Sequence, residues 1–154
     1  MSKHETYMRL ALEEARKALE EGEIPVGAVL VRDDKILCRA HNLREQTGDP
    51  TAHAEILCMR EGARIIGDWR LCGCTLYVTL EPCPMCAGAM TQCQLDACIF
   101  GAADARMGCC GSVYDLPSDP AFGASTRWES DILKEECAKI LQDFFHNLRH
   151  GCAE

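Results

Sequence analysis

The chain has 154 residues, a formal net charge of −8 and a hydrophobic content of 47%. This composition excludes an intrinsically disordered chain, and the length predicts a single domain over residues 1–154. The charge argues against broad, nonspecific binding of nucleic acids, so any polyanionic partner would need a local basic patch. No apolar run approaches the roughly twenty residues of a membrane helix, and no export signal is recognisable, so we expect a cytoplasmic protein.

Cap and turn residues divide the chain into alternating helices and strands, which indicates a layered α/β domain. Ser2 and Glu5 can form a capping box before the first helix, and Gly22 can end it. Asp33 and Asp34 fit the turn of a β-hairpin. In chain order, the expected elements are a helix over 8–22, strands over 25–31 and 35–40, a polar loop over 42–50, a helix over 51–63, a strand over 75–80, a helix over 83–93, a strand over 97–102, a short strand around residue 127 and a helix over 132–150.

Cysteine is unusually frequent, with twelve residues spread along the chain. Several lie inside apolar runs, as Cys38, Cys98 and Cys137 do, where a free thiol acts as a small buried hydrophobe. A disulfide framework would need an oxidising compartment, so we expect most of these thiols to be free. This abundance also means that a pair of close cysteines is, by itself, weak evidence of a metal site.

One cysteine pair differs from the others because it stands at the start of a predicted helix. Cys83 and Cys86 are three positions apart and share a helix face, where free N–H groups and the helix dipole favour thiolates. Pro82 is expected in the first turn of this helix. His53 also stands at a helix start, with Thr51 as the expected cap. Together they offer three ligands, the number that leaves Zn²⁺ one open position.

Glu55 favours a catalytic site over a structural one. A carboxylate two residues from a zinc-binding histidine can carry protons, whereas a structural zinc site has no use for it. A structural site with a fourth cysteine and a redox CxxC pair are the alternatives that the residues leave open. Because positions i and i+2 do not share a helix face, His53 must project from an irregular helix start, or the helix must be distorted. The combination of HxE with PCxxC is typical of zinc nucleobase deaminases.

Five segments carry a resemblance to the bacterial tRNA-specific adenosine deaminase family, within the zinc-dependent cytidine and deoxycytidylate deaminase superfamily. They are IPVGAVLV, DPTAHAEI, LYVTLEPCPMCAGAM, FGAADARMGCCGS and DILKEECAKILQDFF, in order over roughly residues 7–145. The resemblance implies a three-layer α/β/α fold with a central mixed five-stranded sheet, and a homodimer. It also implies hydrolytic deamination of adenosine to inosine at the wobble position of a tRNA anticodon loop, with zinc-activated water.

The same resemblance implies the roles of the metal-site residues. His53, Cys83 and Cys86 match the zinc ligands of the family, with one Zn²⁺ per chain. Glu55 matches its proton shuttle. The expected enzyme is therefore a zinc-dependent hydrolase.

The substrate contacts that the resemblance implies lie in three further segments. Asn42 matches a residue that hydrogen-bonds the flipped nucleoside, and Asp104 matches an acid near its ribose. Phe145 and Arg149 fall where the last helix of the family touches the anticodon stem-loop, the expected partner. On chemistry alone, Asn42 and Asp104 also fit simple turn-forming roles. Ala103 departs from the family, which commonly has a basic residue there.

Two other functions compete with the tRNA deaminase. The first uses the same chemistry on a free base or nucleoside of the guanine or cytosine type, and the acidic charge favours it. The second is a zinc-stabilised or redox module without catalysis, which Glu55 opposes. If RNA is the substrate, we expect a basic patch near the site formed by Arg106, Arg127, Lys139 and Arg149.

Overall fold

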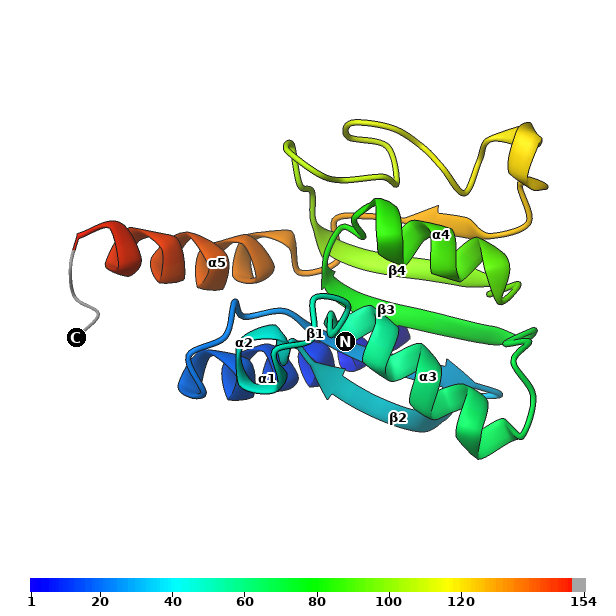
Figure 1. Cartoon of the computed structure of the whole chain (residues 1–154), viewed down its shortest axis with the longest axis horizontal. Coiled ribbons are helices and arrows are strands. Elements are labelled where there is room, and N and C mark those ends of the chain that lie inside the picture. The colour runs from blue at the N-terminus through cyan, green and yellow to red at the C-terminus, as the bar shows by residue number, and fades with distance from the viewer. Residues whose placement is uncertain (151–154) are drawn as a thin grey trace.

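A mixed five-stranded sheet forms the centre of the computed structural model, which describes residues 1–150 (Figure 1). Its strands, in the order β2-β1-β3-β4-β5 across the sheet, are β1 (Gly27–Arg32), β2 (Lys35–His41), β3 (Cys74–Leu80), β4 (Ala97–Ala102) and β5 (Arg127–Glu129). β1 pairs antiparallel with β2 and β3, whereas β3, β4 and β5 run parallel. The predicted mixed sheet is thus confirmed. Cys152 lies outside the described residues.

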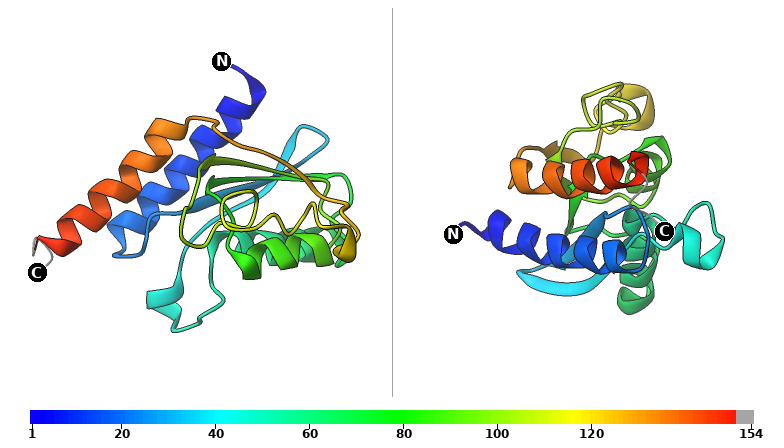
Figure 2. Two further views of the ribbon diagram at one scale, coloured as in Figure 1. Left: turned by 90° about the horizontal axis from the view of Figure 1, so that it is seen from above. Right: turned by 90° about the vertical axis from the view of Figure 1, so that its left-hand side faces the viewer.

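Helices cover both faces of this sheet. α1 (Lys3–Glu20) and α5 (Lys134–Arg149) lie side by side on one face, and α3 (Ala54–Ile66) and α4 (Pro84–Gln92) lie on the other (Figure 2). The connecting segments hold the short α2 (Arg44–Thr47) and the 3₁₀ turn η1 (Pro120–Phe122). The structure therefore confirms the three-layer α/β/α architecture. Within residues 1–150, no helix combines the length and apolar character that crossing a membrane requires.

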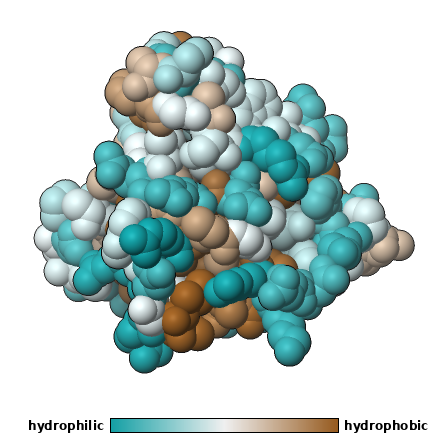
Figure 3. All heavy atoms as spheres, turned by 90° about the vertical axis from the view of Figure 1, so that its right-hand side faces the viewer, coloured by the Kyte–Doolittle hydropathy of each residue, from teal (hydrophilic) through white to brown (hydrophobic). Residues whose placement is uncertain are grey.

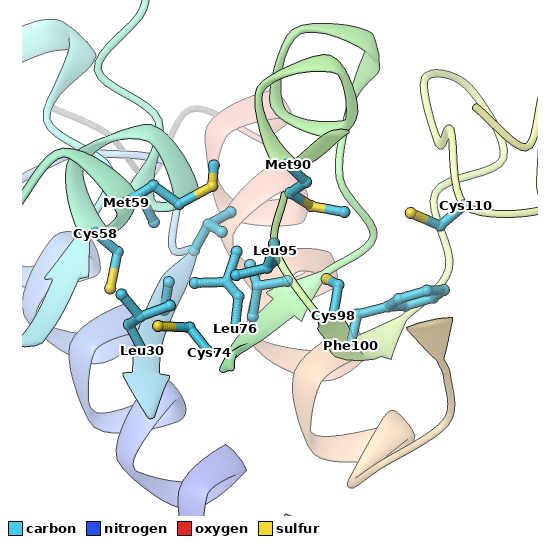
Figure 4. Close-up of a cluster of buried hydrophobic side chains, with 14 of the residues drawn as sticks. Leu30, Cys58, Met59, Cys74, Leu76, Met90, Leu95, Cys98, Phe100 and Cys110 are labelled. Atoms are coloured by element: carbon cyan, nitrogen blue, oxygen red, sulfur yellow. The ribbon is translucent and has the colours of Figure 1, made fainter. Parts of the chain in front are cut away.

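The core is split into two layers because successive strand residues point to opposite faces. Leu30 and Leu76 pack toward α3 and α4, whereas Val29 and Ile99 pack toward α1 and α5. The layer under α3 and α4 is rich in sulfur, as Figure 4 shows for its cysteines and methionines, among them Met90. Every described cysteine is free, and most are buried. The thiols outside the motif thus act mainly as core fillers, as predicted.

The N-terminal third of the chain folds as its cap and turn residues predict. Ser2 and Glu5 form the capping box of α1, and Gly22 follows the helix with a φ of +81°. Asp33 and Asp34 join β1 to β2 with φ of 53° and 60°. Two successive positive φ values match the twist of a two-residue hairpin, and aspartate tolerates this conformation better than most residues.

Two predicted helix starts are wrong, and both errors concern the site. Thr51 does not cap α3, because its hydroxyl donates to Asp49 in the preceding turn, and His53 takes the N-cap position instead. α4 begins at Pro84, one residue after the expected start, with Cys83 as its N-cap residue. Pro82 therefore precedes the helix and does not lie in its first turn. The predicted loop over 42–50 also contains α2. α3 continues beyond residue 63 and ends at residue 66, because Gly67 adopts the left-handed C-cap conformation there.

The end of the sheet away from these helix starts has a mixed surface. Trp69 and Ile65, at the C-terminal end of α3, are 58% and 45% exposed. Figure 3 shows this end of the molecule, where hydrophobic residues (brown) lie among hydrophilic ones (teal). The helix starts themselves lie at the opposite end, beside the carboxyl ends of β3 and β4.

Candidate metal and substrate site

Two neighbouring helix N-termini bring the predicted metal ligands together. Cys83 is the N-cap residue of α4, Cys86 lies in the first turn of that helix, and His53 is the N-cap residue of α3. His53 has extended backbone angles, φ −77° and ψ 151°. It therefore lies outside the helix proper, which explains how His53 and Glu55 can serve one site although positions i and i+2 of a helix diverge. The helix is not distorted.

The donor atoms of this trio have the spacing of a zinc site. Nδ1 of His53 lies 3.6 Å from Sγ of Cys83 and 3.5 Å from Sγ of Cys86. All three donor atoms lie within 4.8 Å of one another. Typical Zn–S and Zn–N bond lengths in a tetrahedron place nitrogen about 3.6 Å from sulfur, so both distances from His53 match a Zn²⁺ site. Within residues 1–150, this is the one such group of metal-ligating side chains.

Interactions within the trio favour the thiolate form of Cys83. A hydrogen bond from the Cys86 thiol, together with His53, lowers the pKa of Cys83 to about 4. The same bond to the Cys83 sulfur, together with burial, raises the pKa of Cys86. The hydrogen bond with Cys83 also raises the pKa of His53. Cys83 is thus favoured as a thiolate before any metal binds, and a metal cation would stabilise that thiolate further.

Glu55 lies in the first turn of α3, where its side chain is buried. Burial raises the pKa of Glu55 to about 7, because a carboxylate loses hydration energy away from water. A carboxyl group with a pKa near neutrality can both accept and return a proton at physiological pH. The position and chemistry of Glu55 therefore suit a proton carrier.

A cavity of about 750 Å³ opens beside the trio. Its walls come from the segment that precedes β1, the end of β3, the segments that follow β2 and β4, the starts of α3 and α4, and the second half of α5. The lining residues are Ile24, Val26, Asn42, Arg44, His53, Ala54, Glu55, Leu80, Glu81, Cys83, Ala103, Asp104, Ala105, Arg106, Met107, Leu141, Gln142, Phe145 and Arg149. The structure thus brings all eight predicted site residues, except the buried Cys86, to the wall of one cavity.

Asn42 and Asp104 both line the cavity and both stabilise turns. Oδ1 of Asn42 accepts a hydrogen bond from the amide of Arg44 (3.2 Å), and Oδ1 of Asp104 accepts one from the amide of Arg106 (3.0 Å). Both residues therefore have the turn-forming role that their residue types predict. The same hydrogen bonds fix their side chains at the cavity wall. Phe145 and Arg149 lie on one face of α5, whose last turns close the cavity on a third side.

Sequence reasoning missed Arg44, Glu81 and Glu23 at this site. Nη1 of Arg44 lies 3.4 Å from Nε2 of His53, and both residues line the cavity. Glu81 and Glu23 are buried carboxylates. Glu81 accepts a hydrogen bond from the amide of Asp104, and Glu23 accepts one from the amide of Glu45. The signal for Glu81 was its place directly before the PCxxC motif. Arg44 and Glu23 carry no comparable signal in one sequence.

The predicted basic patch is only partly correct. Arg106 and Arg149 line the cavity, and Arg44 joins them. Arg127 lies at the opposite end of the sheet, where it pairs with the first residue of β4. Lys139 forms an ion pair with Asp143 of its own helix (2.9 Å). The positive charge near the site therefore comes from Arg44, Arg106 and Arg149, and not from Arg127 or Lys139.

The family follows from these features together with a match of residues 1–102 to the model described as the cytidine and deoxycytidylate deaminase zinc-binding region. The chain belongs to this family of zinc-binding deaminases. Within it, the tRNA-specific adenosine deaminase of Bacillus subtilis (strain 168) is 48% identical over 149 residues, which cover 97% of this chain and 92% of the relative.

Solved structures agree with this assignment. A chain from a study of A-to-I editing by tRNA A34 deaminases at the wobble position of transfer RNA superposes with a TM-score of 0.85 at 40% identity. The match covers 88% of this chain and 99% of that chain. The guanine deaminase from Bacillus subtilis superposes with a TM-score of 0.63 at 37% identity, over 67% of this chain and 66% of that chain. The tRNA deaminase structure is therefore the better match.

Proposed function

We propose that this protein deaminates adenosine to inosine at the wobble position of a tRNA anticodon loop by hydrolysis. The observation that carries the chemistry is the buried Glu55 beside a His–Cys–Cys trio at the wall of a large cavity. The similarity to tRNA-specific adenosine deaminases, which extends along nearly the whole chain, supports the choice of substrate.

His53, Cys83 and Cys86 would hold one zinc ion per chain. When bound, zinc activates the water that attacks carbon 6 of adenine. Glu55 takes a proton from this water and delivers it to the adjacent ring nitrogen. A second proton transfer lets the carbon–nitrogen bond break, so that ammonia leaves and inosine remains. Glu55 suits both transfers because its pKa is raised to about 7 by burial.

The cavity wall supplies the contacts to the nucleotide. Asn42 would bind the flipped base and Asp104 would approach its ribose. Phe145 offers a partly exposed ring on α5 for stacking, and Arg149 offers a cation for a phosphate. A base in an anticodon loop is already partly unstacked, so moving it into the cavity costs less than it would in a duplex.

The whole chain, residues 1–154, would act as one cytoplasmic deaminase domain in a homodimer. Exposed apolar side chains support the dimer, because Met107, Val113 and Tyr114 stand close together in sequence in the loop that borders the cavity. A single chain leaves these side chains in water. Light scattering on the purified protein tests this assembly, since a mass of one chain at micromolar concentration would refute it.

The test of the proposed function is inosine formation on a full-length tRNA transcript with adenosine at the wobble position. Nucleoside analysis by mass spectrometry should find inosine at that position, formed about 10²–10⁴-fold more slowly with Glu55→Gln. A transcript with guanosine at the wobble position is the matched control and should remain unchanged.

A free purine base is the second candidate substrate. Structural similarity to a guanine deaminase favours it, and a cavity of about 750 Å³ is large enough for a purine. Conversion of guanine to xanthine by the purified protein, with the tRNA transcript unchanged, would support this candidate against the first.

A further inference from the structure

A second carboxylate, Glu81, is buried beside the site and has no part in the chemistry described above. It directly follows β3, and its side chain is 2% exposed. A buried carboxylate is costly unless hydrogen bonds compensate for the lost water. Glu81 obtains this compensation from one segment, residues 104–112, which we refer to as the wall loop.

The wall loop donates four hydrogen bonds to Glu81. Oε1 accepts from the amide of Asp104 (3.0 Å) and from the hydroxyl of Ser112. Oε2 accepts from the amides of Cys110 (2.9 Å) and Ser112 (3.1 Å). Each oxygen therefore has two donors, and hydrogen bonds to a charged acceptor are the stronger kind.

The backbone of the wall loop also wraps tightly around this carboxylate. A methyl group at Gly108 would stand 2.3 Å from Cδ of Glu81 and 2.5 Å from the carbonyl oxygen of Asp104. The loop contains no helix and no strand of the sheet. Besides the bonds to Glu81, the amide of Cys109 donates to the carbonyl of Pro82 (2.8 Å), and the side chain of Cys110 is buried in the core. Glu81 thus accepts hydrogen bonds from three amides of the loop, those of Asp104, Cys110 and Ser112, which no helix or strand of the sheet pairs.

The same loop forms one wall of the cavity. The cavity is lined there by Asp104, Arg106 and Met107. The side chain of Asp104 accepts hydrogen bonds from the amides of Arg106 (3.0 Å) and Met107 (3.3 Å). Anchoring the amide of Asp104 therefore fixes the whole corner of the wall that faces the substrate.

We propose that Glu81 is a positioning residue that sets the shape of the substrate wall through the backbone of residues 104–112. It acts on substrate binding rather than on the metal or the proton transfers. This proposal rests on the proposed function for its substrate, the stem-loop RNA, whereas the anchoring of the loop can be tested without any substrate.

Glu81→Gln is the most discriminating variant because it keeps the size of the side chain. An amide has one acceptor and one donor end. With nitrogen at the Oε1 position, the Ser112 hydroxyl can turn to accept, and only the Asp104 amide loses its partner. The opposite orientation would leave the amides of Cys110 and Ser112 unpaired, so the first is favoured. The substitution should therefore release Asp104 selectively.

Amide hydrogen exchange reads out this release. In Glu81→Gln, protection of the Asp104 amide should fall roughly tenfold or more, the equivalent of one lost charged hydrogen bond, while Cys110 stays within about threefold. Gly108→Ala perturbs the contact from the loop side and should also lower protection at Asp104. This second variant carries the test if Glu81→Gln does not fold.

Steady-state kinetics on an anticodon stem-loop separates positioning from general destabilisation. At a temperature where both proteins are folded, Glu81→Gln should raise KM about tenfold and change kcat less than about threefold, with zinc content unchanged. Thr126→Val is the matched control, because it removes a buried hydroxyl that donates to Leu95 (2.6 Å) away from the cavity. It should lower stability but leave KM unchanged.

Two results would overturn the proposal. Wild-type protection at Asp104 in both variants would show that Glu81 does not anchor the loop. A fall in kcat together with zinc content, at constant KM, would assign Glu81 to support of the nearby Cys83. If the protein has no activity on RNA, the proposed function fails, but the exchange measurement still decides whether Glu81 anchors the wall loop.

Discussion

The sulfur of Cys83 lies 3.6 Å from Nδ1 of His53, although thirty positions separate the two residues in the chain. The closeness arises because both are N-cap residues of helices on the same face of the sheet. A cap residue has its side chain beside the free N–H groups of the helix, where negative charge is stabilised. The fold therefore brings two predicted metal ligands together from two helix starts.

The first prediction concerns zinc. Purified protein should contain about one zinc ion per chain, because three convergent ligands leave one position open for water. Elemental analysis measures this directly. The double variant His53→Ala, Cys83→Ala should lose the metal, and Cys72→Ala, which removes an exposed thiol outside the trio, should retain it. Full zinc occupancy in the double variant would place the metal elsewhere.

The second prediction concerns proton transfer. Glu55→Gln should lower turnover by about 10²–10⁴-fold, the usual contribution of a positioned acid–base group, while zinc content and fold stay unchanged. The amide fits the same buried space but cannot carry the proton. Activity within tenfold of the wild type would remove Glu55 from this role.

The third prediction uses the lowered pKa of Cys83 in protein freed of zinc by a chelator. Since this pKa is lowered to about 4, the reactive thiolate exists at every pH above that value. Alkylation of Cys83 by iodoacetamide should therefore proceed at a nearly constant rate from pH 6 to 8. Peptide mass spectrometry at several times measures this rate.

Cys93 provides the internal comparison for this experiment. Burial raises its pKa to about 11, so it should stay protonated and react slowly over the same range. An ordinary thiol increases its rate about tenfold per pH unit below its pKa. Such a tenfold rise for Cys83 would show that the interactions with Cys86 and His53 do not lower its pKa.

The fourth prediction concerns the cation at the end of α5. Arg149→Glu should lower kcat/KM for an anticodon stem-loop several-fold and reduce the salt dependence of binding by about one phosphate contact. Arg64→Glu is the matched control, because Arg64 is exposed on α3 and pairs with Glu61 outside the cavity. Equal losses in both variants would mean that net charge, and not a contact at Arg149, governs binding.

Much of the fold was predictable because local signals agree with the tertiary structure. The capping box of Ser2 and Glu5, the two aspartates of the hairpin and the apolar strands all appear where the sequence placed them. The HxE and PCxxC motifs predicted His53, Cys83 and Cys86 as metal ligands, and the structure brings their donor atoms within 4.8 Å of one another.

The rest depends on contacts between segments distant in sequence. Thr51 appeared to be the helix cap because the hydrogen bond from its hydroxyl to Asp49 cannot be read from residue types. Glu81 was missed because its partners, such as Cys110, lie up to 31 positions away. Arg127 was placed near the site, but the parallel pairing of β5 with β4 carries it to the far end of the sheet.

The account is tested most directly by inosine formation on an anticodon stem-loop, measured beside a panel of free bases and nucleosides that includes guanine, cytosine and adenosine. We predict efficient deamination of the wobble adenosine at low salt, at least about a hundredfold faster in kcat/KM than any free base, because the wall loop and α5 would contact the RNA beyond the target base. Efficient turnover of guanine or a free nucleoside, with the stem-loop untouched, would contradict it.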